Sequence, residues 1–288
     1  MIGFLGPSGT FTEQAAHSAF PTADATSFRP MPSIPAVLDA VADGEVRSGV
    51  VPMENSIQGT VHVTIDGLLA RPTLEITREI LLRIEQHLMV LEGVNGEQIE
   101  EVWSHPQALA QCRSFIRDRK LREVQFDSTA AAAAALALSA RKDVAAIGPQ
   151  QAAVEHGLAV IENNIADVTE NWTRFAVVRS VGTGEVNTLV GDGFDEIEEK
   201  KTMLVVTPYQ NIPGVLASVL NVFSALGLNL SWIESRPTRQ RLGTYQFFVE
   251  IQTGIETESL KRSIGVIEAY GHKVHILGSY QSASVQGR

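Results

Sequence analysis

The stretch EITREILLRIEQHLMVL, residues 75–91, decides how this chain is divided. Within it Ile80, Leu82 and Ile84 stand at alternate positions, which is the period of a β-strand, whereas the flanking segments mix short apolar runs with helical patterns. The stretch therefore predicts a long strand or strand pair that carries the chain from one α/β lobe into another. A return near Asn163 makes a second crossing, and two crossings predict a cleft with a hinge.

On both sides of this stretch, short β-branched or apolar runs alternate with helical patterns. The runs IGFL, SGVV, VWS, VQF, VAAIG and RFAVV are typical of strands, and the alternation predicts parallel α/β layers. The alanine-rich segment after Ser128 predicts a close-packed helix, because alanine is the best helix former. Ligands of open α/β folds bind beyond the carboxyl ends of strands, so the loops after these runs are expected to carry the chemistry.

Composition limits the classes of partner. The chain has 288 residues, of which 44% are hydrophobic and 19% charged, and this predicts two or three packed units. The net charge is −10 without a Lys/Arg-rich block, so neither nucleic acid nor a membrane surface is an expected partner. The N-terminal residues lack the pattern of a signal peptide, and a cytoplasmic location is expected.

Cysteine and histidine usage gives no expectation of a metal site. The single cysteine, Cys112, excludes an intrachain disulfide and predicts a buried helix residue, and the seven histidines show no paired ligand spacing.

The loops after the strands are rich in hydroxyl and amide groups. Residues 6–12, GPSGTFT, form a turn that feeds a helix whose first N–H groups suit an anion, without the spacing of a nucleotide-binding loop. Asn55 and Ser56 follow the run VVPM and either cap a helix or bind a ligand. His105 follows VWS, and residues 127–129 read first as a helix cap. The polar pair Thr173 and Arg174 is expected to face a small carboxylate-bearing substrate.

Taken in order, the motifs GPSGTFT, VPMENSIQGTV, SHPQALAQC, DSTAAA and NWTRF resemble those of the prephenate dehydratase family. The resemblance covers residues 1–180 and implies an α/β catalytic domain of two lobes, like a type II periplasmic binding protein, with the active site between them. Lobe 1 is expected at about residues 1–76 and 163–180, and lobe 2 at about residues 77–162.

The resemblance implies a carbon–oxygen lyase (hydro-lyase) that needs no metal or organic cofactor. Prephenate would lose carbon dioxide and water together to give phenylpyruvate, a step of phenylalanine biosynthesis. Two alternatives stay open at this point: arogenate dehydratase, which performs the same chemistry on the amino-acid analogue, and a non-catalytic sensor of amino acids or small carboxylates.

The family motif implies roles for particular residues. Thr173 is expected at the ring hydroxyl, by hydrogen bonding or proton relay, with Phe175 completing the motif. Arg174 is expected to pair with a substrate carboxylate, a structural salt bridge between lobes being the alternative. Direct catalysis by His105 or Asp127 is the less favoured reading. The residues expected to bind substrate are Gly9, Thr10, Asn55, Ser56, Ser104 and Gln111.

The pattern changes after the catalytic segment. Residues 181–200 are glycine-rich and acidic and predict a linker. Residues 201–281 then predict the order βαββαβ, a ferredoxin-like unit, and residues 282–288 a tail. No chorismate mutase region fits, so a monofunctional enzyme is expected.

The segment GVLASVLNVFSALGLNLSWIESRP, residues 214–237, resembles an ACT domain. In this family such a domain binds L-phenylalanine between subunits, which implies allosteric feedback inhibition and a dimer through the ACT domains, extended to a tetramer as a dimer of dimers. The residues implied in phenylalanine binding are Gly214, Val215, Leu216, Ala217, Asn229, Glu234, Ser235, Arg236 and Pro237.

Overall fold

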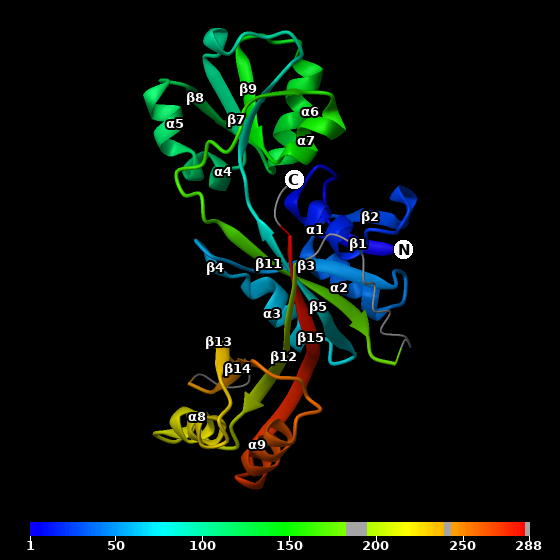
Figure 1. Ribbon diagram of the computed structural model, residues 1–288, viewed down its shortest axis with the longest axis vertical. Coiled ribbons are helices and arrows are strands. Elements are labelled where there is room, and N and C mark those ends of the chain that lie inside the picture. The colour runs from blue at the N-terminus through cyan, green and yellow to red at the C-terminus, as the bar shows by residue number, and fades with distance from the viewer. Residues whose placement is uncertain (183–194, 239–242, 286–288) are drawn as a thin grey trace.

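The computed structural model describes residues 1–182, 195–238 and 243–285, and arranges them in three tiers (Figure 1). Lobe 1 occupies the middle tier, lobe 2 stands above it, and the C-terminal domain lies below. Most of the predicted linker, residues 183–194, falls outside the described residues.

Lobe 1 is built on strands that are buried on both faces. The parallel strands β1 (Ile2–Leu5), β2 (Phe28–Met31) and β3 (Ser48–Asn55) are joined by the antiparallel strands β11 (Trp172–Ser180) and β5 (Leu74–Arg83) in the order β5-β11-β3-β1-β2. The remaining elements are the short β4 (Gly59–Thr60) and the helices α1 (Phe11–Ala19), α2 (Ile34–Ala42) and α3 (His62–Leu69). One apolar core lies under α1, and another lies under α2 and α3.

Lobe 2 contains a second sheet in the order β10-β6-β9-β7-β8. Its alanine-rich helix α6 (Thr129–Ser139) buries Ala130, Ala132 and Ala133, whose small side chains allow close packing, so the predicted close-packed helix is confirmed. The strands are β6 (His87–Val90), β7 (Glu101–Ser104), β8 (Arg122–Gln125), β9 (Val144–Gly148) and β10 (Ala159–Glu162). The other helices are α4 (Pro106–Gln111), α5 (Arg113–Asp118) and α7 (Gln150–His156).

The crossing into lobe 2 comes later in the chain than residue 77. Strand β5 pairs with β11 from Leu74 to Arg83, so residues 77–83 belong to the sheet of lobe 1 and the predicted boundary is wrong there. The long strand predicted from the alternation of Ile80, Leu82 and Ile84 does exist, and these three side chains pack in one core. The chain crosses just after it and returns before β11.

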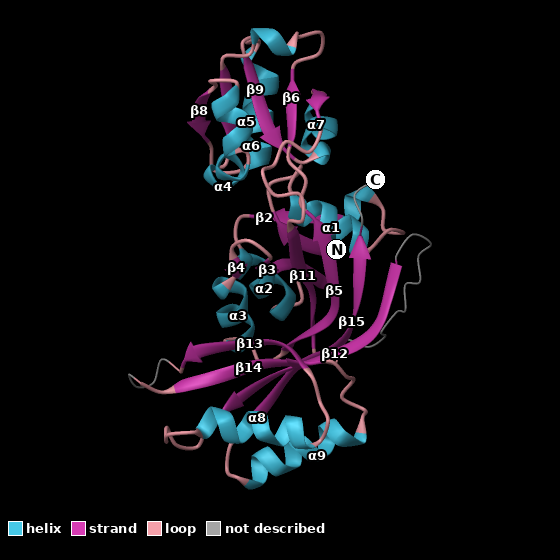
Figure 2. Cartoon of the chain, turned by 60° about the vertical axis from the view of Figure 1, so that its left-hand side comes forward, coloured by secondary structure: helices cyan, strands magenta, loops and turns pink. Residues whose placement is uncertain are grey.

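The C-terminal domain has the predicted ferredoxin-like order βαββαβ. Its elements are β12 (Asp195–Thr207), α8 (Val215–Ala225), β13 (Leu230–Pro237), β14 (Tyr245–Ile251), α9 (Glu258–Ala269) and β15 (Lys273–Val285). The strands follow the order β13-β14-β12-β15. Figure 2 shows α8 and α9 on the face of this sheet that is turned away from lobe 1.

The sheets of lobe 1 and the C-terminal domain are continuous. Residues 281–285 of β15 pair in parallel with residues 78–82 of β5, so residues 282–285 are strand and not the predicted tail. Likewise β12 begins at Asp195, inside the predicted linker. At Gly278 an added Cβ would lie 2.1 Å from the carbonyl oxygen of Ile76, so only glycine permits this close approach of the two strands.

One apolar core spans both units. It joins α2, α3, β3, β5 and β11 of lobe 1 to the inner face of the C-terminal sheet, where it includes Met203, Val205, Phe248 and Leu277. The two units therefore share buried apolar surface as well as backbone hydrogen bonds. Among the described helices, none is long and apolar enough to span a membrane.

Candidate active site

A cavity of about 610 Å³ opens between lobe 1 and lobe 2, which is a size suited to a small organic ligand. Lobe 1 contributes the ends of β1 and β3 and the starts of β11 and α1, and lobe 2 contributes one side of α4 and the start of α6. Five of the residues predicted to act on substrate line it: Thr10, Asn55, Gln111, Thr173 and Phe175.

Thr173 is held at the cavity wall by Asn55 on the neighbouring strand. The two residues are paired across β3 and β11, and Asn55 Nδ2 donates to Thr173 Oγ1 over 2.9 Å. The same Asn55 Nδ2 donates to Asn171 Oδ1, while Asn55 Oδ1 accepts from the backbone N–H groups of Ile57 and Gln58. Because Thr173 Oγ1 accepts from Asn55, its own O–H proton points away from Asn55. Thr173 is buried, with only 8% of the residue exposed.

Lobe 2 presents amide and imidazole groups. Gln111 lies opposite, and its Oε1 accepts from Nε2 of Gln86, which lies in the crossing between the lobes. The other two amide atoms, Gln86 Oε1 and Gln111 Nε2, are buried without a hydrogen-bond partner in the described part of the chain. His105 caps α4, with Nδ1 accepting from Gln107 N. The unpartnered amide atoms indicate that the site is incomplete without a polar ligand.

The described lining of the cavity offers no lysine or arginine to a negatively charged ligand, and Asp127 adds an exposed carboxylate. The positive ends of two helices face the cavity instead: α1, capped by Thr10, and α6, capped by Ser128, whose Oγ accepts from Ala131 N. Backbone N–H groups at helix starts attract carboxylates.

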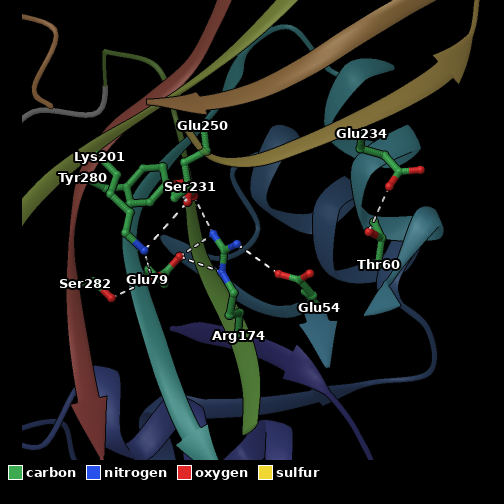
Figure 3. Close-up of polar contacts among 10 residues, drawn as sticks. All are labelled: Glu54, Thr60, Glu79, Arg174, Lys201, Ser231, Glu234, Glu250, Tyr280 and Ser282. Atoms are coloured by element: carbon green, nitrogen blue, oxygen red, sulfur yellow. Dashed lines mark hydrogen bonds and ion pairs between the residues drawn. The ribbon is translucent and has the colours of Figure 1, made fainter. Parts of the chain in front are cut away.

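Arg174 is not part of the cavity wall. Side chains alternate along a strand, so Arg174 points to the opposite face from Thr173 and Phe175, toward the C-terminal domain (Figure 3). There Nη1 contacts Glu54 at 3.0 Å and Nε contacts Glu79 at 2.9 Å, and Nη2 also bonds Glu250. The prediction that Arg174 pairs with a substrate carboxylate is therefore wrong in this structure.

Electrostatics support a fixed charge at Arg174. Burial alone lowers its pKa, but the carboxylates of Glu79 and Glu250 and the neighbouring Tyr280 raise the pKa well above the usual value. The salt bridge expected as the alternative for Arg174 exists, but it joins lobe 1 to the C-terminal domain rather than lobe 1 to lobe 2.

Three further predicted residues lie beside the cavity wall rather than on it. Gly9 N donates to Glu13 Oε2 over 2.6 Å, so its N–H is occupied by the protein. Ser56 Oγ accepts from Trp172 N and fixes the start of β11. Ser104 is fully buried, and its hydroxyl donates to Ile147 O over 2.6 Å. Each of them supports a neighbour of the site instead of presenting its polar group.

Sequence reasoning missed Gln86 and gave Gln107 no role. Gln86 belongs to no motif, and its only signal is its place at the crossing between two lobes, where a cleft is expected. Phe11, Thr12, Ile84 and Gln107 complete the lining close to the hinge.

The residues implied in phenylalanine binding lie at two places in the C-terminal domain. Gly214, with φ of +84°, stands before α8, followed by Val215, Leu216 and Ala217 in its first turn. Ser235 and Pro237 lie in the edge strand β13, while Asn229 just before it bonds Gln252.

Two of these residues contact lobe 1. Glu234 accepts from Thr60 Oγ1 at 3.1 Å and lies 3.1 Å from His62 Nε2, and Arg236 pairs with Asp66 in two hydrogen bonds. The edge strand is thus tied to β4 and α3.

No group of three or more His, Cys, Asp or Glu residues in the described part of the chain is placed to hold a metal ion. Cys112 lies between α4 and α5, fully buried, and burial with nearby Asp167 raises its pKa to about 12.

Comparison with known proteins agrees with this arrangement. Residues 2–182 match the family model described as prephenate dehydratase, and residues 206–268 match the ACT domain. A prephenate dehydratase of Bacillus subtilis is 35% identical over 98% of this chain and 98% of that protein. An arogenate dehydratase/prephenate dehydratase of Arabidopsis thaliana is 32% identical over 97% of this chain and 72% of that protein.

Solved structures give the same result. The crystal structure of prephenate dehydratase from Arthrobacter aurescens in complex with L-Phe is 33% identical in sequence and superposes with a TM-score of 0.84. The match covers 97% of this chain and 89% of that one.

Proposed function

Since the chain belongs to the prephenate dehydratase family, we propose that it converts prephenate to phenylpyruvate, carbon dioxide and water in phenylalanine biosynthesis. The observation that carries this proposal is the hydrogen bond from Asn55 to Thr173 Oγ1 at the wall of the cavity between the lobes. The bond leaves the threonine proton free to be donated to a ligand.

The chemistry needs help at the leaving hydroxyl. Hydroxide is a poor leaving group, so the ring oxygen must gain a proton or a strong hydrogen bond while carbon dioxide departs from the ring carboxylate. Thr173 O–H supplies that hydrogen bond, and Asn55 fixes its direction. Aromatisation of the ring provides the driving force, and the electron pair released by decarboxylation forms the new ring double bond.

The substrate carboxylates are held by backbone and amide groups. The starts of α1 and α6 offer N–H groups, and Gln111 Nε2 offers a donor that has no hydrogen-bond partner among the residues that the structure describes. Phe175, on the same face of β11 as Thr173, contributes an apolar surface for the ring. These contacts orient the substrate and exclude water when the lobes close.

Arogenate is a second candidate substrate because of one feature of the cavity. The cavity is lined by the exposed carboxylate of Asp127, and none of its described lining residues is Lys or Arg. Such a lining suits a substrate that carries an ammonium group. The relative from Arabidopsis thaliana is named for both activities, which supports testing both substrates.

The experiment that tests the function is turnover of prephenate and of arogenate by the wild-type protein and by Thr173→Val and Thr173→Ser. The valine variant keeps the shape of threonine and loses the hydroxyl, so we expect kcat to fall at least about 100-fold, whereas the serine variant retains most activity. No turnover of either substrate above the spontaneous rate would refute the proposal. If Asp127 holds an ammonium group, Asp127→Asn lowers turnover of arogenate alone.

We further propose that the ACT domain binds L-phenylalanine and that binding inhibits the enzyme. The relative from Arthrobacter aurescens was crystallised in complex with L-Phe, and here the turn at Gly214 provides backbone N–H groups for its carboxylate, whereas the carboxylate of Glu234, in the middle of β13, is bonded to Thr60 in this structure. Strand β13 forms an edge of the sheet, which supports a dimer through ACT domains and a tetramer built from two such dimers. The cytoplasmic location stays a prediction.

A further inference from the structure

The catalytic strand has a second polar face, directly behind the proposed proton donor. Thr173 and Arg174 are neighbours on β11, so the guanidinium is linked to the catalytic hydroxyl by a single peptide unit. The ion pairs that fix the guanidinium therefore restrain the backbone next to Thr173. The groups that hold Arg174 therefore belong to the machinery that positions this hydroxyl.

One of the three carboxylates that bind Arg174, and the lysine that pairs with two of them, come from another domain. Lobe 1 supplies Glu54 and Glu79, and the C-terminal domain supplies Glu250 from β14 and Lys201 from β12 (Figure 3). Lys201 Nζ lies 2.8 Å from Glu79 Oε1 and 3.7 Å from Glu250 Oε1. These five charged residues are called the interdomain charge cluster below.

Glu250 is the most deeply buried member of the cluster, with a side chain that is 0% exposed. Its carboxylate accepts from Arg174 Nη2, from Tyr280 OH over 2.6 Å and from Ser231 Oγ. A buried carboxylate with this many donors is held in one position. Its donors lie on β11, β13 and β15. The position of this carboxylate therefore depends on how the C-terminal sheet is placed relative to β11.

A second contact ties the same two units on the other side of the catalytic pair. Glu234 binds Thr60 and His62, and β4, which contains Thr60, pairs with Glu54 and Asn55 of β3. Strands β3 and β11, which carry Asn55 and Thr173, are therefore both held by the C-terminal domain.

We propose that Glu250 is a positioning residue for Thr173: through Arg174 it couples the placement of the ACT domain to the geometry of the catalytic hydroxyl. This inference rests on the proposed dehydratase function and adds a residue of the regulatory domain to the groups on which the reaction depends. Displacement of β14 would separate Glu250 from Arg174, and the guanidinium would then be bound by Glu54 and Glu79 alone.

The test compares Glu250→Gln with Glu256→Gln in the full-length protein. Glutamine keeps the shape and removes the charge that holds Arg174. Its one amide oxygen can take the place of the oxygen that accepts from Tyr280 and Arg174, and its NH2 group then faces Ser231 Oγ, which can accept in place of donating. Glu256 is the matched control, since it lies in the same domain and pairs with Lys200, but with a side chain that is 57% exposed. The readouts are kcat and KM for the substrate, binding of L-phenylalanine by calorimetry, and its inhibition constant.

We expect Glu250→Gln to lower kcat about tenfold or more, because small misplacements of a catalytic group are costly, and to change KM less than about twofold. Phenylalanine should bind this variant as tightly as the wild type and inhibit it less. Glu256→Gln should match the wild type in every readout. Unchanged kcat and unchanged inhibition in a folded Glu250→Gln variant would overturn the inference.

A milder variant covers the case in which Glu250→Gln does not fold. Tyr280→Phe removes one donor to Glu250 and leaves the ring packing and every charge in place, so we expect a smaller fall in kcat, about two- to fivefold. A folded Tyr280→Phe variant with wild-type kcat would refute the positioning role. Absence of turnover by the wild-type protein refutes instead the proposed function, which keeps the two failures distinct.

Discussion

At the scale of the residue, the alternation of side chains along β11 places residues of the cavity on one face and residues that bind other parts of the protein on the other. Thr173 and Phe175 face the cavity, and Arg174 between them faces the C-terminal domain. A motif of three consecutive residues therefore serves two sides of one sheet. Sequence reasoning treated the motif as a single catalytic unit and so assigned Arg174 to the wrong side.

Glu79 provides a prediction about pH at this scale. Burial alone raises its pKa, but Arg174 and Lys201 together outweigh burial and hold the pKa below the usual value for a glutamate. A carboxylate whose folded pKa is depressed stabilises the protein fully above the unfolded pKa and loses that contribution as the pH falls through the folded pKa. The stabilisation by Glu79 is therefore present at neutral pH and is lost in acid, below about pH 4.5.

Urea denaturation at a series of pH values between 7 and 3 measures this contribution. We expect Glu79→Gln to lower the free energy of unfolding at pH 7 by about 3–5 kcal/mol, because it leaves buried cations without a partner, and to approach the wild type in acid. Glu92→Gln, at an exposed position, is the control and should parallel the wild type. If the free energies of unfolding of Glu79→Gln and the wild type differed by the same amount at every pH, Glu79 would not have the lowered pKa assigned to it.

At the scale of the element, the starts of helices carry the proposed binding of carboxylates. Ser128 caps α6 and lines the cavity. Ser33 caps α2, with Oγ accepting from Ala36 N, and does not itself line the cavity, although its neighbour Pro32 does. The two caps are chemically equivalent, so they separate the effect on stability from the effect on substrate binding.

Ser128→Ala and Ser33→Ala should each lower the free energy of unfolding by about 1 kcal/mol, the usual cost of a lost cap. Only Ser128→Ala should raise KM, by roughly threefold, since the N–H groups of α6 are then less well aligned toward the carboxylate. Steady-state kinetics and denaturation of both variants check this. A similar rise in KM in both variants would show that the α6 start has no special part in binding.

At the scale of the whole molecule, lobe 1 and the C-terminal domain behave structurally as one unit. They share the strand pair β5–β15, an apolar core and the interdomain charge cluster. Lobe 2 has its own sheet and its own cores and is connected by two crossings. We therefore expect the C-terminal domain and lobe 1 to unfold together.

Calorimetry of core variants tests this expectation. Leu260→Ala, in the separate core of the C-terminal domain, and Val50→Ala, in the core under α1, should shift the same transition by several degrees, at one protein concentration. Ile147→Ala in lobe 2 provides the comparison. Two resolved transitions, with Leu260→Ala moving one and Val50→Ala the other, would show that the domains unfold independently.

The sequence by itself determined the elements, the two-lobed catalytic domain, the βαββαβ order of the ACT domain and the family. These follow from local periodicity and from short motifs in a fixed order, as for the alternation of Ile80, Leu82 and Ile84. Five of the nine residues predicted to act on substrate also line the cavity: Asn55 ends β3, Thr10 caps the start of α1, Thr173 and Phe175 lie near the start of β11, and Gln111 ends α4.

Only the tertiary structure decided which side chains reach the cavity and which support it. Ser56, Ser104 and Arg174 look as functional in sequence as the residues of the cavity wall, yet each is bound by a partner that folding brings close. The partners of Arg174 lie 76 to 120 residues away in the chain, beyond any local pattern. Contacts between distant segments depend on strand register and domain packing, and for that reason neither Gln86 at the hinge nor Glu250 behind the catalytic strand was visible in the sequence.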